Sequence, residues 1–160
     1  MAEIRNLWTQ ISSPPSALSV LDHREVCQVH PEDLIGVALD HVRRFNYSQL
    51  PVYDQSGYIG ILTTNAIGRW LADSFVRNTG LAEEQTVREM MQFAEEHDRA
   101  AQVPRTITAA EAIDRLSRRP DVDQHVTVLI VTQGGRTAER PLALIVPYDL
   151  PALTAAIAIT

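Results

Sequence analysis

The sequence predicts an α+β protein of two tandem βαββα repeats, preceded by a short helix. Strand-like runs alternate with amphipathic stretches. The same order of elements returns about 75 residues later, and the spacing inside it also repeats. Val29 to Ala38 corresponds to Val103 to Ala112, and Asp54 to Gly57 corresponds to Thr132 to Gly135. Because neither repeat can bury its own sheet face, we expect the two to pack around a pseudo-twofold axis.

The first 15 residues predict a short amphipathic helix. Ile4, Leu7, Trp8 and Ile11 follow the i, i+3, i+4, i+7 spacing of one helix face. The run from Ser12 to Pro15 ends that helix. Since one short helix is not stable alone in water, we expect its apolar face to pack on the module or on a partner chain.

Residues 16–80 predict the first repeat. A strand at 25–29 precedes a helix that Pro31, Glu32 and Asp33 open. Strands at 49–53 and 58–63 flank a turn at 54–57, and a second helix ends near 78–80. The predicted inward faces carry Leu34, Ala38, Val42 and Phe45 on the first helix, and Ile67, Trp70, Leu71 and Phe75 on the second.

Residues 81–160 predict the second repeat. Thr86 with Glu89, and Thr108 with Glu111, have the spacing of capping boxes that open helices on either side of a strand at 101–103. The second of these helices carries Ala112, Ile113 and Leu116. A continuous apolar strand at 126–131, a long turn at 132–140 and a returning strand at 142–146 follow. Asp149 is predicted to cap the last helix.

Composition excludes several classes of protein. A net charge of −6 and a pI near 5.3 argue against a nucleic-acid binder. No apolar run approaches the ~20 residues of a membrane span, and the N-terminus does not resemble a signal peptide. Cys27 is the only cysteine, so it predicts an inert buried side chain and no internal disulfide. We therefore expect a cytoplasmic soluble protein.

No pattern of residues predicts catalysis. Phosphate-loop, dinucleotide-binding and zinc-protease motifs are missing from the sequence. The five histidines are scattered without the spacing of metal ligands. Charge clusters at 95–98 and 121–123 are of the kind that usually faces solvent. The sequence thus predicts neither an enzyme nor a catalytic cofactor nor a metal site.

Three segments resemble the first repeat of a CBS-domain pair, also called a Bateman module. They are residues 26–33, 47–54 and 60–63, and residues 87–91 look like the family's inter-repeat helix. The resemblance extends over residues 16–158. It makes the chain similar to small stand-alone CBS-pair proteins, some of which bind AMP or cyclic di-AMP and act on separate enzymes.

The resemblance implies two ligand clefts between the repeats. In the family, a Thr and an Asp spaced T-x-x-D open the last helix of each repeat and meet phosphate and ribose respectively. A helix N-terminus favours phosphate, and a carboxylate can accept both ribose hydroxyls. Here the first repeat has Thr63 but Ala66 at the Asp position, whereas the second has Asp149 but Val146 at the Thr position.

The resemblance also implies the residues of each cleft. The favoured nucleotide-binding cleft comprises Val26, Cys27, Tyr47, Ser48, Gln49, Tyr148 and Asp149, with Tyr148 placed to stack on a base. The other comprises Thr63, Thr64, Asn65, Gln102, His125 and Thr127, and it lacks a ribose carboxylate.

Each candidate residue has a purely structural alternative. Asp149, Thr63 and Asn65 could be helix caps only, Tyr47 a surface aromatic, and His125 an ordinary strand residue. Arg136 and Arg140 on the long turn could reach a phosphate, although such loops are usually solvated.

The function that the sequence favours is a regulatory module that binds an adenine nucleotide of the AMP, ATP or cyclic di-AMP class and signals to a separate protein. The alternative is an interaction or dimerisation module whose clefts are degenerate. A homodimer is expected under both hypotheses. CBS pairs commonly associate through their helices, and apolar stripes such as Ile67, Trp70 and Leu71 need covering.

Overall fold

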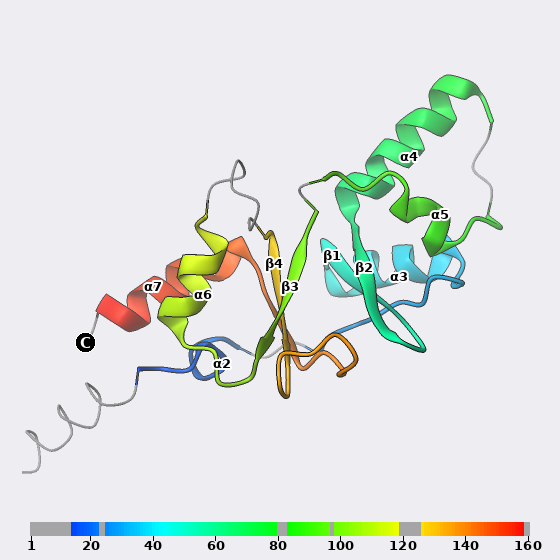
Figure 1. The fold of residues 1–160 in the computed structure, drawn as a ribbon. Helices are drawn as coiled ribbons and strands as arrows, with labels where there is room; N and C mark the ends of the chain where they lie inside the picture. Colours follow the sequence, from blue (N-terminus) through cyan, green and yellow to red (C-terminus); the bar gives the residue numbers. More distant parts are fainter. Residues whose placement is uncertain (1–13, 23–24, 80–82, 97, 119–125, 159–160) are drawn as a thin grey trace, which may run out of the picture. The chain divides into compact units, whose positions relative to one another are not determined.

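A computed structural model describes residues 14–22, 25–79, 83–96, 98–118 and 126–158. They form two compact units (Figure 1), and we describe each separately. The central unit is Cys27–Arg99, and the terminal unit combines Met1–Val26 with Ala100–Thr160. The apolar residues of the predicted N-terminal helix, Ile4, Leu7, Trp8 and Ile11, lie outside the described residues.

The central unit is a β-hairpin with three helices. Its elements are α3 (Ile35–Phe45), β1 (Gln49–Asp54), β2 (Gly57–Thr63), α4 (Thr64–Arg77) and α5 (Val87–Met91). Strands β1 and β2 are antiparallel and pair Gln49 with Thr63 at the open end. On the other edge of β1, Val29 forms a single parallel bridge with Val52. The core includes Val29, Ala38, Leu50, Leu62 and Trp70, with Cys27 packed partly buried against it.

The strand predicted at 25–29 is reduced to that one bridge. The Val29 N–H donates to the Pro51 carbonyl at 3.1 Å, and the Tyr53 N–H donates to the Val29 carbonyl at 3.0 Å. The next rung of a parallel ladder would need an N–H from Pro51, and proline has none. The prediction of a five-residue strand was therefore wrong, because Pro51 on the neighbouring strand ends the pairing at Val29.

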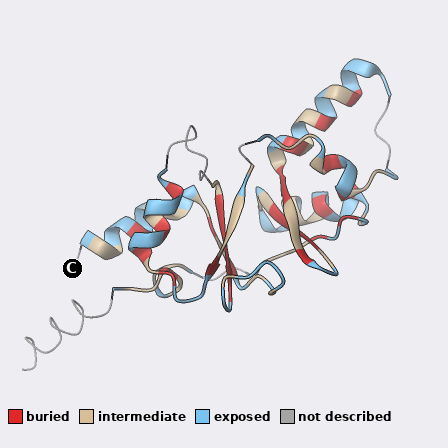
Figure 2. Ribbon diagram, viewed as in Figure 1, coloured by how far each residue is buried: buried red, intermediate tan, exposed pale blue. Residues whose placement is uncertain are grey.

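The terminal unit contains a three-stranded sheet. Its elements are α2 (Ala17–Val20), β3 (Ala100–Pro104), α6 (Ala109–Leu116), β4 (Val128–Thr132), β5 (Ala143–Ile145), a 3₁₀ turn η1 (Pro147–Asp149) and α7 (Leu150–Ala158). Strand β3 runs parallel to β4, which is antiparallel to β5. Every residue of β4 is buried, as the continuous apolar run predicts, and Figure 2 shows this strand as the buried centre of its sheet.

The two units repeat one topology, so the predicted α+β class and the βαββα order are confirmed. In each, a first extended segment pairs in parallel with the strand that follows a helix, as the single bridge at Val29 in the central unit and as β3 in the terminal unit, and a hairpin and a closing helix follow. Ala38 and Ala112, which correspond in the repeat, are both fully buried. The corresponding turn glycines Gly57 and Gly135 both have positive φ, at 120° and 78°.

Each short helix that precedes a repeat packs on the other repeat. In the central unit, the Val87 N–H of α5 donates to the Asp33 carbonyl at 2.8 Å. In the terminal unit, the Ala17 N–H of α2 donates to the Ile107 carbonyl at 2.9 Å. The packing units thus differ from the ranges 16–80 and 81–160 predicted for the repeats. The ranges 16–80 and 81–160 describe where the repeated sequence begins and ends, and they stay a prediction.

The inward face of α4 differs from the predicted one. Ala66, Trp70 and Ser74 are buried at four-residue spacing, whereas Leu71 is 46% exposed and Phe75 86% exposed. Ala66 and Trp70 belong to the core of the central unit. The hydrophobic pattern favoured Leu71 and Phe75 because it gives weight to large apolar residues and little to Ala and Ser.

Helix α3 shows the same kind of correction. Ala38 is buried as predicted, but Leu34 and Phe45 are about half exposed, and the Phe45 ring stacks on Tyr47 with centroids 5.6 Å apart. Ile35, which the predicted face left out, is buried instead. Among the described residues, no helix combines the length and the apolar character needed to cross a membrane.

Candidate functional site

Thr63 connects the end of β2 to the start of α4. Its backbone is extended, and its Oγ1 accepts a hydrogen bond from the Ala66 N–H at 3.1 Å, so it is the N-cap of the helix. Thr63 is only 5% exposed, and Ala66 is fully buried. A carboxylate at position 66 would therefore lie in the core of the central unit.

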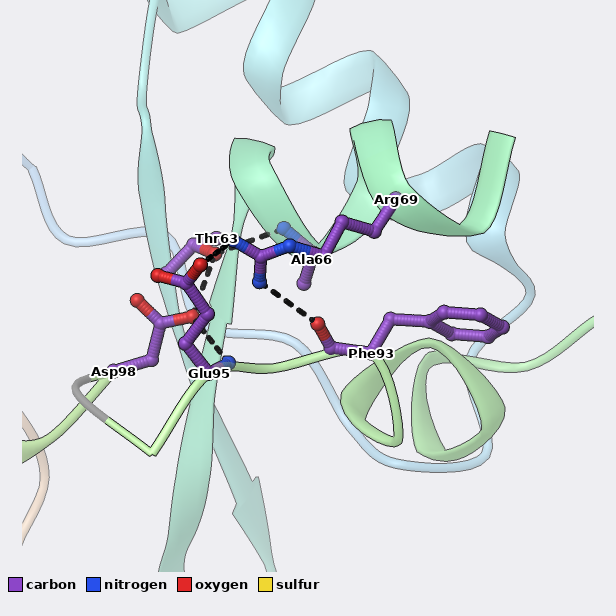
Figure 3. A network of polar contacts seen from close by, with 6 residues as sticks. All are labelled: Thr63, Ala66, Arg69, Phe93, Glu95 and Asp98. Atoms are coloured by element: carbon purple, nitrogen blue, oxygen red, sulfur yellow. Dashed lines mark hydrogen bonds and ion pairs between the residues drawn. The ribbon is translucent and has the colours of Figure 1, made fainter. Parts of the chain in front are cut away.

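The Thr63 hydroxyl has a second partner from a distant part of the chain. It donates to Asp98 Oδ2 at 3.2 Å, and the same carboxylate oxygen accepts the Glu95 N–H at 3.0 Å (Figure 3). From the second turn of α4, Arg69 donates to the Phe93 carbonyl at 3.2 Å and forms an ion pair with Glu95. Figure 3 shows the guanidinium of Arg69 reaching across to this segment.

The sequence interpretation of the charge cluster at 95–98 was right that Glu95 is exposed, but Asp98 is partly buried at the cap of α4. Both carboxylates contact α4 or its cap rather than only solvent. The sequence did not predict these contacts because the partners, Thr63 and Arg69, are separated from Asp98 and Glu95 by 35 and 26 residues, beyond the reach of any local pattern.

Asp149 lies in the first turn at the start of α7, not at the N-cap position. Its Oδ2 accepts the Val146 N–H at 2.9 Å, so the carboxylate reaches back to the residue that precedes the turn. Among the residues that the structure describes, its Oδ1 has no hydrogen-bond partner. The N-cap prediction was wrong by three positions, because Val146 has the extended backbone of the cap and Pro147 begins the turn.

The start of α7 offers few donors to a phosphate. Pro147 has no N–H, the Asp149 N–H donates to the Val146 carbonyl and the Leu150 N–H donates to the Pro147 carbonyl. The Tyr148 N–H makes no hydrogen bond within the described part of the chain. The Tyr148 side chain is 88% exposed. An exposed ring and a carboxylate with one free oxygen are suited to the base and ribose of a nucleoside.

Four other residues of the favoured set belong to the central unit. Ser48 Oγ donates to Gln49 Oε1 at 2.7 Å, and the Thr64 N–H donates to the Ser48 carbonyl at 3.0 Å. The start of β1 and the start of α4 therefore lie side by side. Tyr47 stacks on Phe45 and Cys27 is half-buried, while Val26 belongs to the terminal unit.

The second predicted set is also divided between the units. Thr63, Thr64 and Asn65 begin α4, whereas Gln102 and Thr127 lie in or beside the sheet of the terminal unit. Gln102 Nε2 is buried without a hydrogen-bond partner in the described structure. His125 lies outside the described residues.

Both arginines of the long turn are exposed. Arg136 forms an ion pair with Glu139 within the turn, Nε to Oε1 at 3.4 Å. In the described ranges, no three side chains of His, Cys, Asp or Glu come close enough together to hold a metal ion.

Comparison with known protein families gives one match, to the CBS domain model over residues 20–73. Residues 20–73 are therefore similar to a CBS domain. The matched range includes Val29, β1, β2 and the first turns of α4, and therefore Thr63 with its cap. A search among curated proteins gives no match to this sequence.

Solved structures of CBS-domain proteins share the fold of nearly the whole chain. CBSX2 in complex with AMP is 14% identical with a TM-score of 0.57, covering 91% of this chain and 98% of that one. The CBS domain pair of protein MJ0100, in complex with methylthioadenosine and S-adenosyl-L-methionine, is 14% identical with a TM-score of 0.60, covering 90% and 98%. A CBS-domain protein from Kribbella flavida is 14% identical with a TM-score of 0.59, covering 88% and 97%. The chain thus has the fold of a CBS-domain pair.

Proposed function

We propose that this chain is a regulatory module that binds an adenine nucleotide, of the AMP, ATP or cyclic di-AMP class, at the start of α7. The observation that supports this most is the arrangement of Asp149. Its Oδ2 is held by the Val146 N–H at 2.9 Å, which fixes the carboxylate, and its Oδ1 has no partner among the described residues. A fixed carboxylate can accept two ribose hydroxyls in charge-assisted hydrogen bonds.

The ligand of two neighbours in fold supports the same proposal. One of them is in complex with AMP and another with methylthioadenosine and S-adenosyl-L-methionine, all of which contain adenosine. We extend the proposal to the residues that the sequence predicts around the ligand, and the exposed Tyr148 ring would stack on the base. The predicted set is Val26, Cys27, Tyr47, Ser48, Gln49, Tyr148 and Asp149.

The module would act by regulation rather than catalysis. The ligand is a regulatory one, no catalytic cofactor is needed, and the signal would pass to a separate protein in the cytoplasm. We further propose that the chain is a homodimer, because Leu71, Phe75 and Val76 leave an apolar surface exposed on α4.

Thermal unfolding with a panel of ligands tests nucleotide binding. The panel is AMP, ADP, ATP, cyclic di-AMP, S-adenosylmethionine and NADH. A ligand that binds only the folded state stabilises it by about 2.7 kcal/mol at one hundred times its Kd. We expect at least one adenine nucleotide to raise the Tm, and Asp149→Ala to abolish that rise.

The matched control for this variant is Asp114→Ala, which removes an exposed carboxylate from α6 in the same unit. It should leave the ligand-induced rise unchanged. Since Asp149→Ala also removes a hydrogen bond to Val146, its own Tm will be lower, and only the difference made by ligand is compared. A panel without any rise would overturn the proposal.

The bonding of Thr63 favours a second candidate function, an interaction module with degenerate clefts. The Thr63 hydroxyl already donates its proton to Asp98, so this residue has no free proton for a phosphate. This candidate predicts no response to the ligand panel but a stable complex with a partner protein. Loss of nucleotide binding in Asp149→Ala would exclude it.

A further inference from the structure

We propose that the segment around Phe93, Glu95 and Asp98 is an internal lock on the start of α4, which keeps a nucleotide out of the first repeat and limits the chain to one bound nucleotide. This inference rests on the proposed function, because it concerns the second of the two sites that a CBS pair would offer. The lock lies entirely within the central unit.

The first part of the lock is the hydrogen bonding of Thr63. A Thr hydroxyl has a single proton, and here it is donated to Asp98 Oδ2 at 3.2 Å. The oxygen of the same hydroxyl accepts the Ala66 N–H at 3.1 Å. A phosphate oxygen would need the Thr63 proton, so it could bind only after Asp98 had left.

The second part is the charge of Asp98. A carboxylate beside the first turn of a helix occupies the position where the free N–H groups and the helix dipole would attract an anion. It repels a phosphate approaching the same groups. The Glu95 N–H donates to the same Oδ2 at 3.0 Å and so holds the carboxylate in this orientation.

The third part is the attachment of the segment along α4. Arg69 lies in the second turn of the helix, where it donates to the Phe93 carbonyl at 3.2 Å and pairs with the Glu95 carboxylate. Figure 3 shows contacts at both ends of the segment, with Arg69 at one end and Thr63 at the other. For Asp98 to leave the Thr63 hydroxyl, it would have to move while Phe93 and Glu95 of the same segment remain bound to Arg69.

Calorimetric titration with AMP tests the lock, because it measures how many AMP molecules bind to each chain. We expect one AMP per wild-type chain and two per chain for Asp98→Ala. The matched control is Asp73→Ala, which removes a carboxylate near the other end of the same helix, where it pairs with Arg77. This control should bind one AMP with the wild-type affinity.

If Asp98→Ala does not fold, the same titration is made with a second variant, Asp98→Asn. It removes the charge and keeps an acceptor for the Thr63 hydroxyl, and a neutral acceptor forms the weaker hydrogen bond. We expect it to add the same second site with a lower affinity.

The outcomes separate the lock from the proposed function. Wild-type protein that binds neither AMP nor ATP nor cyclic di-AMP contradicts the proposed function, and the lock is then judged by whether Asp98→Ala gains a site. The lock is wrong if removing the Asp98 charge leaves the number of sites unchanged. It is equally wrong if Asp98→Ala loses a site, since Asp98 would then be a ligand contact.

Discussion

Glu139 organises the turn between β4 and β5 with one carboxylate. Its Oε2 accepts hydrogen bonds from the Gly134 N–H at 2.7 Å, from Thr132 Oγ1 at 2.8 Å and from the Arg136 N–H at 3.2 Å. The Gly134 N–H and the Thr132 hydroxyl are the main causes that hold the pKa of Glu139 below its ordinary value of 4.5. The carboxylate thus fills the inside of the turn.

The lowered pKa of Glu139 predicts how the stability of this turn depends on pH. A carboxyl group whose pKa is lower in the folded state contributes stability above its unfolded pKa and loses it as pH falls through the folded value. We expect Glu139→Gln to lower the Tm at pH 7. The difference from wild type should shrink as pH falls below the ordinary value of 4.5.

Thermal unfolding of both proteins between pH 7 and pH 3 measures this prediction. Glu83→Gln provides a control at an exposed carboxylate of the central unit. If the difference in Tm between wild type and Glu139→Gln does not change with pH, the negative charge of Glu139 does not stabilise the turn.

At the scale of elements, the sequence correctly predicted the helix starts and the turn that are made by residues close to one another along the chain. Thr86 and Thr108 form capping boxes with Glu89 and Glu111, as their three-residue spacing indicates. The turn at Asp54 also has the predicted chemistry, because Asp54 Oδ1 accepts the Ser56 N–H at 2.7 Å. These contacts are local, so the order of residues suffices to predict them.

The elements that the sequence predicted poorly depend on neighbours in space. The strand at 25–29 ends early because of Pro51, and the buried face of α4 carries the small residues Ala66 and Ser74 beside Trp70. Leu71 and Phe75 consequently face outward on α4, four residues apart and thus on one side of the helix.

The exposed side of α4 predicts the effect of a charge at position 75. If this surface is the dimer contact, Phe75→Glu should convert a dimer to a monomer, because an unpaired carboxylate is costly to bury. Since Phe75 is 86% exposed, the substitution should leave the Tm of the monomer almost unchanged. Light scattering gives the mass of each protein, and Arg77→Glu on the exposed end of the same helix is the control for charge alone.

A wild-type chain that is monomeric over the micromolar range would contradict the proposed dimer. A dimer that persists in Phe75→Glu would place the contact elsewhere on the molecule.

At the scale of the whole molecule, the duplication could be predicted because it repeats residue types at a fixed distance. Val29 and Val103 both pair in parallel with a neighbouring strand, and Ala38 and Ala112 are both buried. The exchange of α2 and α5 between the repeats could not be predicted. Such short helices have no stable position of their own, and only tertiary contacts decide where they pack.

The candidate site was predicted in part. The two helix starts were found from the resemblance to the T-x-x-D pattern, and Asp149 indeed lies in the first turn before α7. The contact between Thr63 and Asp98 has no sequence signal, since no periodicity connects residues 35 positions apart. We nevertheless propose that the nucleotide binds at Asp149, a position that the sequence predicted.

Calorimetric titration of AMP into the wild-type chain and into Asp149→Asn tests that claim most directly. The amide oxygen of the substituted side chain would still accept the Val146 N–H, so the first turn is preserved while the charge is removed. We predict saturable binding of one AMP per wild-type chain and a clear loss of affinity in the variant. Equal affinity in both proteins, or no binding of AMP, ATP or cyclic di-AMP to the wild type, would contradict it.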